Sequence, residues 1–172
     1  MRRPVIGVVG SSKNDSPFLT RASALGRLIA VQGWTVLSGG RDAGVMKAVS
    51  KGAKEVPGSL TIGILPSQSS DVAPDVDVAI VTDIHNARNN IITLSSDAVV
   101  ACGIEGSGTA SEIALALKNN KPVIVIGASH AARAFFEEVA QGKMIHVTTP
   151  EEAVQALFAV LQKRDASDGN KI

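Results

Sequence analysis

Short runs of consecutive apolar residues, many of them β-branched, alternate along this chain with longer segments in which apolar residues recur at helical spacing. Six of these short runs predict strands. Because they are continuously apolar and do not alternate in polarity, they are typical of strands buried on both faces of a parallel sheet. The predicted strands cover residues 5–10, 35–40, 60–65, 77–82, 97–102 and 122–127.

The segments between these strands predict five helices that cover the sheet. The first ends near Gly33, the third ends in the sequence KNNKP before Pro122, and the last begins at Pro150, a favoured first-turn residue. The predicted helices cover residues 19–29, 45–54, 113–117, 131–141 and 150–163. Regular alternation of strand and helix predicts an α/β fold, a single-domain, doubly wound Rossmann-like parallel sheet with helices on both faces.

Composition adds few constraints to this picture. The chain has 172 residues, 45% of them hydrophobic, which suits one ligand-binding domain over residues 1–163 and a polar tail, 164–172, that we expect to be flexible. The formal net charge is +1 and the basic residues form no stripe, so nucleic acid is not an expected partner. No apolar run reaches the ~20 residues of a membrane span, and the lone Cys102 fits a reducing cytoplasm. We therefore expect a cytoplasmic protein with no membrane association.

Ligands of open parallel sheets bind beyond the carboxyl ends of the strands, so the loops at that edge are the candidate sites. After the first strand, Gly10, Ser11 and Ser12 suit an anion, although an ordinary turn with a helix cap explains them equally well. After the second strand, the sequence SGGRDAGVMKA contains three glycines and a cation, more than a structural turn requires. Anion binding is favoured there, through Gly39, Gly40, Arg41 and Gly44.

Two further polar segments follow the fourth and fifth predicted strands. In HNARNN, Arg88 is either a solvated side chain or a clamp on a phosphate or heterocycle, and the role of His85 stays open. In GIEGSGTASEIALAL, the small residues 106–109 introduce a helix whose free N–H groups could hold an anion. Thr109 and Glu112 have the spacing of a capping box, and Glu112 is also placed to act on a bound sugar.

Several familiar signatures are missing from the sequence. The nucleotide-hydrolase motif GxxxxGK[ST] is absent, and GSGTAS lacks both the third small residue and the downstream acidic residue of a dinucleotide-binding site. There is no GxSxG elbow and no cluster of His, Cys, Asp or Glu with metal-ligand spacing, so no metal site is predicted. A dehydrogenase, a P-loop enzyme and a metalloenzyme are therefore disfavoured.

In this order, GVVGSS, SGGRDAGVMKAVSKGA, NARNN and GSGTASE resemble the Rossmann-like superfamily that contains the cytokinin-activating phosphoribohydrolases, often misnamed lysine decarboxylases, and the molybdenum cofactor carrier proteins. The resemblance covers residues 4 to about 161. In the phosphoribohydrolases the fourth motif reads PGGxGTxxE, and the third carries an arginine followed by lysine. On this sequence the motif glutamate falls on Glu112, the arginine on Arg88, and GxGT on residues 106–109.

Departures from the hydrolase pattern point to the carrier branch. Ile104 and Glu105 stand in place of Pro-Gly, and Asn89 stands in place of the lysine. An added negative charge and a lost positive charge should both weaken binding of a nucleoside monophosphate. Chain length and the forms SGGRDAGVM and GSGTASEIALAL are closest to the carriers. The resemblance thus implies binding, protection and transfer of the molybdenum cofactor (molybdopterin), which holds its metal through its own dithiolene sulfurs.

The alternative is a nucleoside 5′-monophosphate phosphoribohydrolase, in which Glu112 and Arg88 would act on the N-glycosidic bond; a nucleotide sensor without turnover is a third hypothesis. All three place a phosphate-bearing ligand in one pocket. The apolar segment 109–119 is either buried under another layer or forms a subunit contact. The resemblance implies a homo-oligomer, a dimer or tetramer, with apo-molybdoenzymes or cofactor-insertion machinery as further partners. The candidate cofactor-binding residues are Gly10, Ser11, Ser12, Gly39, Gly40, Arg41, Gly44, Arg88, Asn89, Asn90, Gly106, Ser107, Gly108, Thr109 and Glu112.

Overall fold

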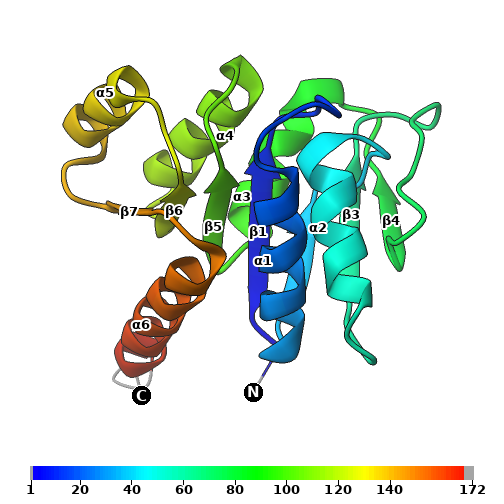
Figure 1. Cartoon of the computed structure of the whole chain (residues 1–172), viewed down its shortest axis with the longest axis horizontal. Helices are drawn as coiled ribbons and strands as arrows, with labels where there is room; N and C mark the ends of the chain where they lie inside the picture. The colour runs from blue at the N-terminus through cyan, green and yellow to red at the C-terminus, as the bar shows by residue number, and fades with distance from the viewer. Residues whose placement is uncertain (1, 169–172) are drawn as a thin grey trace.

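The computed structural model describes residues 2–168 and contains one sheet of parallel strands (Figure 1). The strands are β1 (Val5–Gly10), β2 (Thr35–Ser38), β3 (Thr61–Leu65), β4 (Val78–Val81), β5 (Ala98–Cys102), β6 (Val123–Ile126) and β7 (Met144–Val147). Their order across the sheet is β4-β3-β2-β1-β5-β6-β7, and neighbouring strands are parallel throughout. The predicted doubly wound, Rossmann-like fold is confirmed.

Helices cover both faces of the sheet, as Figure 1 shows. One face packs against α1 (Leu19–Val31), α2 (Gly44–Lys54) and α6 (Pro150–Asp168), and the other against α3 (Arg88–Ser95), α4 (Ser107–Lys118) and α5 (His130–Ala140). A short 3₁₀ helix, η1 (His85–Ala87), precedes α3.

Successive side chains of the central strands enter two separate apolar clusters. On β1, Ile6 and Val8 join the cluster under α1, α2 and α6, whereas Val9 joins the cluster under α3, α4 and α5. This alternation follows from the two-residue repeat of a strand and explains why β1, β5 and β6 are continuously apolar and why β2 is buried throughout. Each of these strands must supply an apolar side chain to both layers.

The two edge strands differ from the prediction of strands buried on both faces. All four residues of β4 are exposed, and β7 was not predicted because its sequence, MIHV, is only half-buried and lacks a continuous apolar run. A second correction concerns the segment HNARNN, which we expected to be a loop. Its residues form η1 and the first turn of α3, where Ile92 supplies the buried contact.

Asp97, which directly precedes β5, links α6 to the start of β1 and the residues before it. Its carboxylate accepts hydrogen bonds from the guanidinium of Arg2 and from the N–H of Val5, at 2.9 and 2.8 Å, and pairs with Arg164 at 2.5 Å. Arg164 belongs to α6, which continues to Asp168 and so extends five residues into the expected tail, 164–172. Residues 169–172 lie outside the described part of the chain, and the domain boundary stays a prediction.

The strand order brings two distant loops together. The chain winds away from β1 in one direction through β2, β3 and β4, and then returns to place β5 on the other side of β1. Gly10 and Cys102, the last residues of β1 and β5, are direct partners in the ladder. The loops that follow them therefore start side by side, at the topological switch point where such folds bind ligands.

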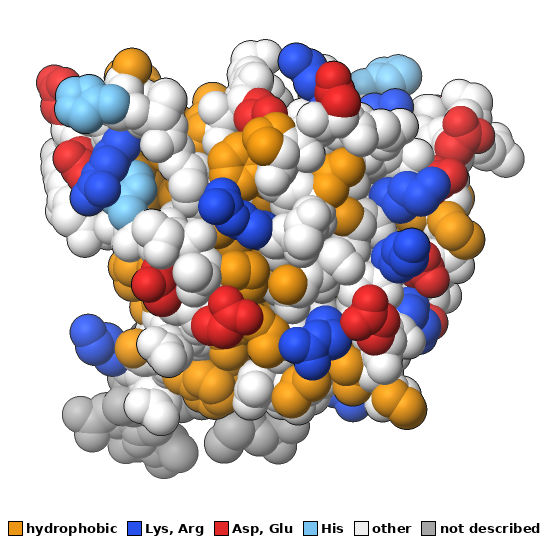
Figure 2. Space-filling view, in the orientation of Figure 1, with side chains coloured by type: hydrophobic (Ala, Val, Ile, Leu, Met, Phe, Trp, Pro, Cys, Tyr) orange, Lys and Arg blue, Asp and Glu red, His pale blue; other side chains and the backbone are white. Residues whose placement is uncertain are grey.

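Two further predictions concern the surface and the thiol. Over the face shown in Figure 2, acidic and basic side chains are interspersed and form no large patch of one sign. Cys102 is fully buried, and burial raises the pKa of its thiol to about 12, so it is an inert core residue. Within residues 2–168 no helix has both the length and the apolarity to cross a bilayer.

Candidate functional site

A cavity of about 290 Å³ opens at the switch point between β1 and β5. Its walls are the loop after β1, Arg41 and Met46 near the start of α2, the residues 86, 88 and 89 of η1 and α3, and the segment from Glu105 through the first turns of α4. This size is close to the lower end for small-molecule sites. Eleven of the fifteen candidate residues line it: Gly10, Ser11, Ser12, Arg41, Arg88, Asn89, Gly106, Ser107, Gly108, Thr109 and Glu112.

Three glycines of the second loop, expected to present N–H groups to a ligand, lie outside the lining. The N–H of Gly44 donates to the Asn14 side chain at 2.9 Å, and the next N–H of α2 donates to the carbonyl of Ser11, also at 2.9 Å. The carbonyl of Gly40 accepts from Ala73, and that of Gly39 accepts from Arg88. These backbone groups hold neighbouring loops in place. The first two N–H groups of α2 are therefore already bonded to protein acceptors and do not face the cavity.

Close backbone approach explains why two of these positions are glycine. Gly44 has a φ of 52°, and a β-carbon there would lie 2.2 Å from the carbonyl oxygen of Ser11. Gly40 has a φ of 71°, and a β-carbon would lie 2.6 Å from the Cα of Gly63. Both conformations favour glycine. Their role is to allow tight packing behind the cavity wall.

Asn90, the fourth candidate outside the lining, points to the neighbouring helix. Its side-chain oxygen accepts a hydrogen bond from Asn119 at 3.3 Å, which joins α3 to the end of α4. Sequence reasoning in turn missed Lys13, Met46 and Asn86 as lining residues. Lys13 directly follows the Gly-Ser-Ser sequence, and that adjacency was the available signal.

The start of α4 presents backbone donors to the cavity. Gly106 is the cap residue and provides no side-chain bond, and the first intrahelical donor is Ala110, whose N–H bonds to the carbonyl of Gly106 at 3.1 Å. Among the described residues, no acceptor bonds to the N–H groups of Ser107, Gly108 or Thr109. Together with the positive end of the helix dipole, these groups form a favourable position for an anion.

The predicted capping box at Thr109 and Glu112 is wrong. Because α4 begins at Ser107, Thr109 already lies inside the first turn and Glu112 one turn further, where its side chain faces the cavity. The same T-x-x-E spacing does form a capping box at α6. There the N–H of Glu152 donates to the hydroxyl of Thr149 at 3.2 Å, and the Glu152 carboxylate accepts from the N–H of Thr149 at 3.3 Å.

Arg88 is buried, with only 8% of its surface exposed, which excludes the alternative of a solvated side chain. Its Nη1 donates to the carbonyl oxygens of Gly39, at 2.6 Å, and Ile64. Burial lowers the pKa of Arg88, and the nearby Glu112 carboxylate opposes this effect. Nη1 therefore ties Arg88 to the ends of β2 and β3, whereas the buried Nε bonds to no acceptor among the described residues.

Glu112 is the unusual group of the site. It is 9% exposed, and burial raises the pKa of its carboxyl from the ordinary 4.5 to about 7, although the positive charge of Arg88 opposes the rise. Among the described residues, no donor hydrogen-bonds to this carboxyl, and no cation lies within the 4 Å of an ion pair. Near neutral pH the carboxyl therefore exists in both protonation states.

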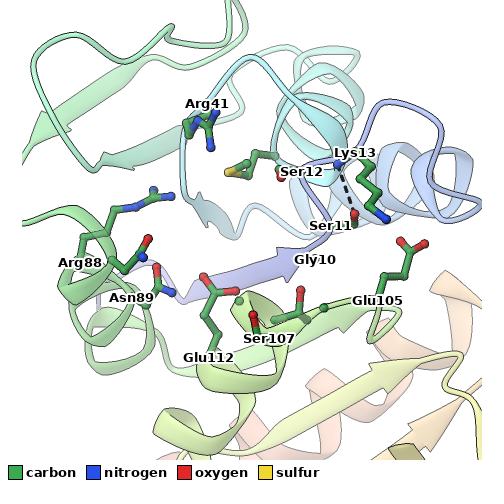
Figure 3. A pocket seen from close by; sticks show the side chains of 15 residues that line it. Gly10, Ser11, Ser12, Lys13, Arg41, Arg88, Asn89, Glu105, Ser107 and Glu112 are labelled. Atoms are coloured by element: carbon green, nitrogen blue, oxygen red, sulfur yellow. Dashed lines mark hydrogen bonds between the residues drawn. The ribbon is translucent and has the colours of Figure 1, made fainter.

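Figure 3 shows how the polar groups divide the cavity. Lys13 and Glu105 lie at one end, and Arg88, Asn89 and Glu112 lie at the other. Glu105, which we expected to bring a negative charge close to a phosphate, accepts a hydrogen bond from the hydroxyl of Ser16. Three basic and two acidic side chains line the cavity, and one of those acids is partly protonated, so the site favours an anion.

Comparison with known proteins shows which family this chain belongs to. The model of the SLOG cluster4 family matches residues 3–154. The chain belongs to the SLOG cluster4 family. A protein of uncharacterized function from Archaeoglobus fulgidus is 43% identical over 123 residues, which are 72% of this chain and 80% of that protein.

Solved structures extend the comparison of this SLOG cluster4 member. The molybdenum cofactor binding protein of the phototrophic bacterium Rippkaea orientalis is 47% identical, with a TM-score of 0.90 over 94% of this chain and 99% of that one. The molybdenum cofactor carrier protein of Chlamydomonas reinhardtii is 43% identical, with a TM-score of 0.88 and the same coverage. The resemblance to molybdenum cofactor carrier proteins, predicted from the loop motifs, is confirmed.

Proposed function

We propose that this protein binds the molybdenum cofactor, protects it and transfers it as a carrier or storage protein. The observation that carries the proposal is a cavity that combines free helix N–H groups, hydroxyls and cations with amide side chains, in a chain 47% identical to the Rippkaea orientalis protein. An anion and a flat polar ring can be held in it together. That combination is what a phosphorylated pterin presents.

The residues present fit the groups of this ligand. Its phosphate would lie against the first N–H groups of α4, with Ser11 and Lys13 nearby, and its pterin against Asn86, Asn89 and Glu112. When bound, the cofactor supplies the dithiolene sulfurs that hold the metal. Residues 2–168 contain no group of three or more His, Cys, Asp or Glu side chains that could hold a metal ion.

One observation favours the alternative, a phosphoribohydrolase. A carboxyl with a pKa of about 7 inside a ligand cavity suits general acid–base chemistry near neutral pH, and Glu112 has this property. The position of Arg88 favours the carrier instead. Its Nη1 is bonded to two backbone carbonyls and is not free to follow a reacting group.

The carrier is further proposed to act in the cytoplasm as a homo-oligomer, a dimer or tetramer, and to deliver its ligand to apo-molybdoenzymes or insertion machinery. The surface of α4 supports the assembly. Ala114 is exposed and Leu115 half-buried, and both border a shallow, mainly apolar groove next to the cavity. Light scattering of the purified protein measures the assembly size, and a monomer at all concentrations would contradict it.

The deciding experiment is purification from cells that make the cofactor and from cells that do not. Molybdenum by elemental analysis, the fluorescence of the oxidised pterin and reconstitution of an apo-molybdoenzyme should all be positive only for the first preparation. Arg41→Ala, which removes a cation from the cavity, should reduce the bound pterin at least tenfold. The exposed Arg27→Ala on α1 is the matched control and should not.

Two results would reverse this conclusion. One is protein from cofactor-producing cells that contains neither molybdenum nor pterin. The other is release of free base from AMP or a cytokinin nucleotide by the purified protein, abolished in Glu112→Gln. The second result would establish the phosphoribohydrolase.

A further inference from the structure

Glu112 has no partner for its carboxyl oxygens within the described protein. The side chain is more than nine-tenths buried, and it points into the cavity from the inner face of α4 (Figure 3). Arg88 is the buried cation on the same side of the cavity. Its Nη1 donates hydrogen bonds to two backbone carbonyls and not to the Glu112 carboxyl. The acceptor capacity of this carboxylate is therefore open to whatever fills the cavity.

Such an arrangement is costly unless a ligand completes it. Burying a polar group without a hydrogen bond destabilises the folded chain, and burying a charged group costs more. Proteins otherwise pair buried acids, as this chain does at Asp97 with two arginines and a backbone N–H. Retaining an unpaired acid at the cavity wall is consistent with a ligand that brings hydrogen-bond donors.

The chemistry of a carboxylate narrows what those donors are. An ionised carboxylate can only accept hydrogen bonds. Its two oxygens are best matched by two parallel N–H donors whose separation is about that of the oxygens. A ring N–H beside an exocyclic amino group offers that pair, as in the 2-amino-4-oxopyrimidine edge of a pterin or a guanine. In a dioxo ring a carbonyl oxygen replaces the amino group. That oxygen would face a carboxylate oxygen, and the two acceptors repel each other.

The helix sets the distance between this group and the anion position. Glu112 follows Ser107 and Gly108 by five and four residues, which separates their backbones by about 6–8 Å along α4 at 1.5 Å per residue. A ligand whose amino-bearing ring edge contacts Glu112 can thus place a nearby phosphate at the N–H groups of the first turn. The Glu112 carboxyl and the anion position therefore both belong to α4 and border the same cavity.

We propose that Glu112 determines which heterocycle the cavity accepts, by receiving hydrogen bonds from the ring N–H and the amino group of a 2-amino-4-oxopyrimidine ring. The assignment rests on the proposed function and names the group that recognises the pterin. Asn86 and Asn89, which line the same cavity from η1 and α3, are available for the other polar atoms of the ring.

The same geometry makes recognition depend on pH. Only the ionised carboxyl accepts at both oxygens, and with a pKa of about 7 the ionised fraction rises between pH 6 and 8. The other charged groups of the cavity are Lys13 from the first loop, Arg41 from the second, Arg88 of α3 and Glu105 before α4. The preference for an amino ring over a dioxo ring should therefore increase with pH across this interval.

Binding of matched ring pairs tests the proposal. The probes are pterin against lumazine, its 2,4-dioxo counterpart, and guanosine against xanthosine 5′-monophosphate, titrated at pH 7.5 by fluorescence and calorimetry. We expect the amino-bearing ring to bind at least tenfold more tightly. Glu112→Gln should reduce this ratio to about one, because an amide both donates and accepts.

Controls separate recognition from folding. Glu138→Gln, an exposed acid on α5, should leave the ratio unchanged, and Glu112→Asp, which keeps an acceptor, should retain part of it. Equal binding of both rings by the unaltered protein, or a ratio that Glu112→Gln does not change in a folded variant, overturns the proposal. If guanosine is preferred through Glu112 but no cofactor is captured from cells, the recognition stands and the carrier function fails.

Discussion

Replacing Glu112 by Gln should stabilise the folded protein at alkaline pH and leave its stability unchanged in acid. Below pH 4.5 the carboxyl is neutral in both the folded and the unfolded chain. Between pH 4.5 and about 7 the unfolded chain releases the proton while the folded chain keeps it, because burial raises the pKa of Glu112 to about 7. The free energy of unfolding therefore falls as pH rises through this interval.

The size of this loss follows from the pKa. A rise from 4.5 to about 7 corresponds to about 3 kcal/mol of unfolding free energy, lost in full above pH 7. Glutamine has nearly the same shape and carries no charge at any pH. The free energy of unfolding of the variant therefore does not fall as pH rises through this interval. At pH 8 it should be more stable than the unaltered protein by up to about 3 kcal/mol.

Urea unfolding at pH 4.5, 6, 7 and 8 measures this difference, with Glu138→Gln as the control for removing an exposed acid. The stability gain of Glu112→Gln should grow with pH and level off near pH 8. A gain that is the same at every pH, or a loss at pH 8, would show that the carboxyl is not held in an unfavourable environment. Glu112→Gln is thus expected to stabilise the protein and to abolish ring discrimination. This combination is typical of a residue that serves binding at a cost in stability.

Two other predictions test the surroundings of the site. Gly44→Ala should lower the melting temperature and cost at least about 1 kcal/mol, because its β-carbon would overlap a backbone carbonyl and its φ is positive; Gly106→Ala, which meets nothing within 4 Å, should melt like the unaltered protein. Burial alone raises the pKa of Asp97, but hydrogen bonds from Arg2, a backbone N–H and Arg164 outweigh burial and lower it. Asp97→Asn should therefore cost about 1–3 kcal/mol in urea unfolding at pH 7, with the deficit shrinking as pH falls below the ordinary 3.8; a deficit independent of pH would contradict this pairing.

The elements that sequence patterns failed to predict have one feature in common. Both β7 and α3 contribute few buried side chains, so neither carries a strong apolar signature: β7 is a half-buried edge strand, and α3 begins with the polar residues RNN. The T-x-x-E spacing was ambiguous because it occurs both at a helix cap and inside a helix. It caps α6 at Thr149, but at Thr109 the helix has already begun two residues earlier, and no local pattern distinguishes the two cases.

The candidate site was predictable where a loop directly follows a central strand. Gly10 to Ser12 and Gly106 to Thr109 end up on one cavity because β1 and β5 are neighbours. Glycines 39, 40 and 44, which we predicted to bind an anion, lie outside the cavity lining. Glycine serves equally for ligand approach and for close packing of backbone. Which of the two applies depends on whether protein or open space faces the residue, and at these positions protein does.

The order of the six predicted strands and five predicted helices, the two-layered core and the family motifs are properties of the sequence by itself, because apolar periodicity and loop composition are local. Only the tertiary structure decided which loops meet and what surrounds each polar group. Arg88 and Glu112 lie 24 positions apart on different helices, and their burial, their charge interaction and the missing partner of the Glu112 carboxyl arise from packing α3 and α4 on the same face of the sheet. Desolvation and Coulomb interactions depend on distances in space, so they became visible only in the folded chain.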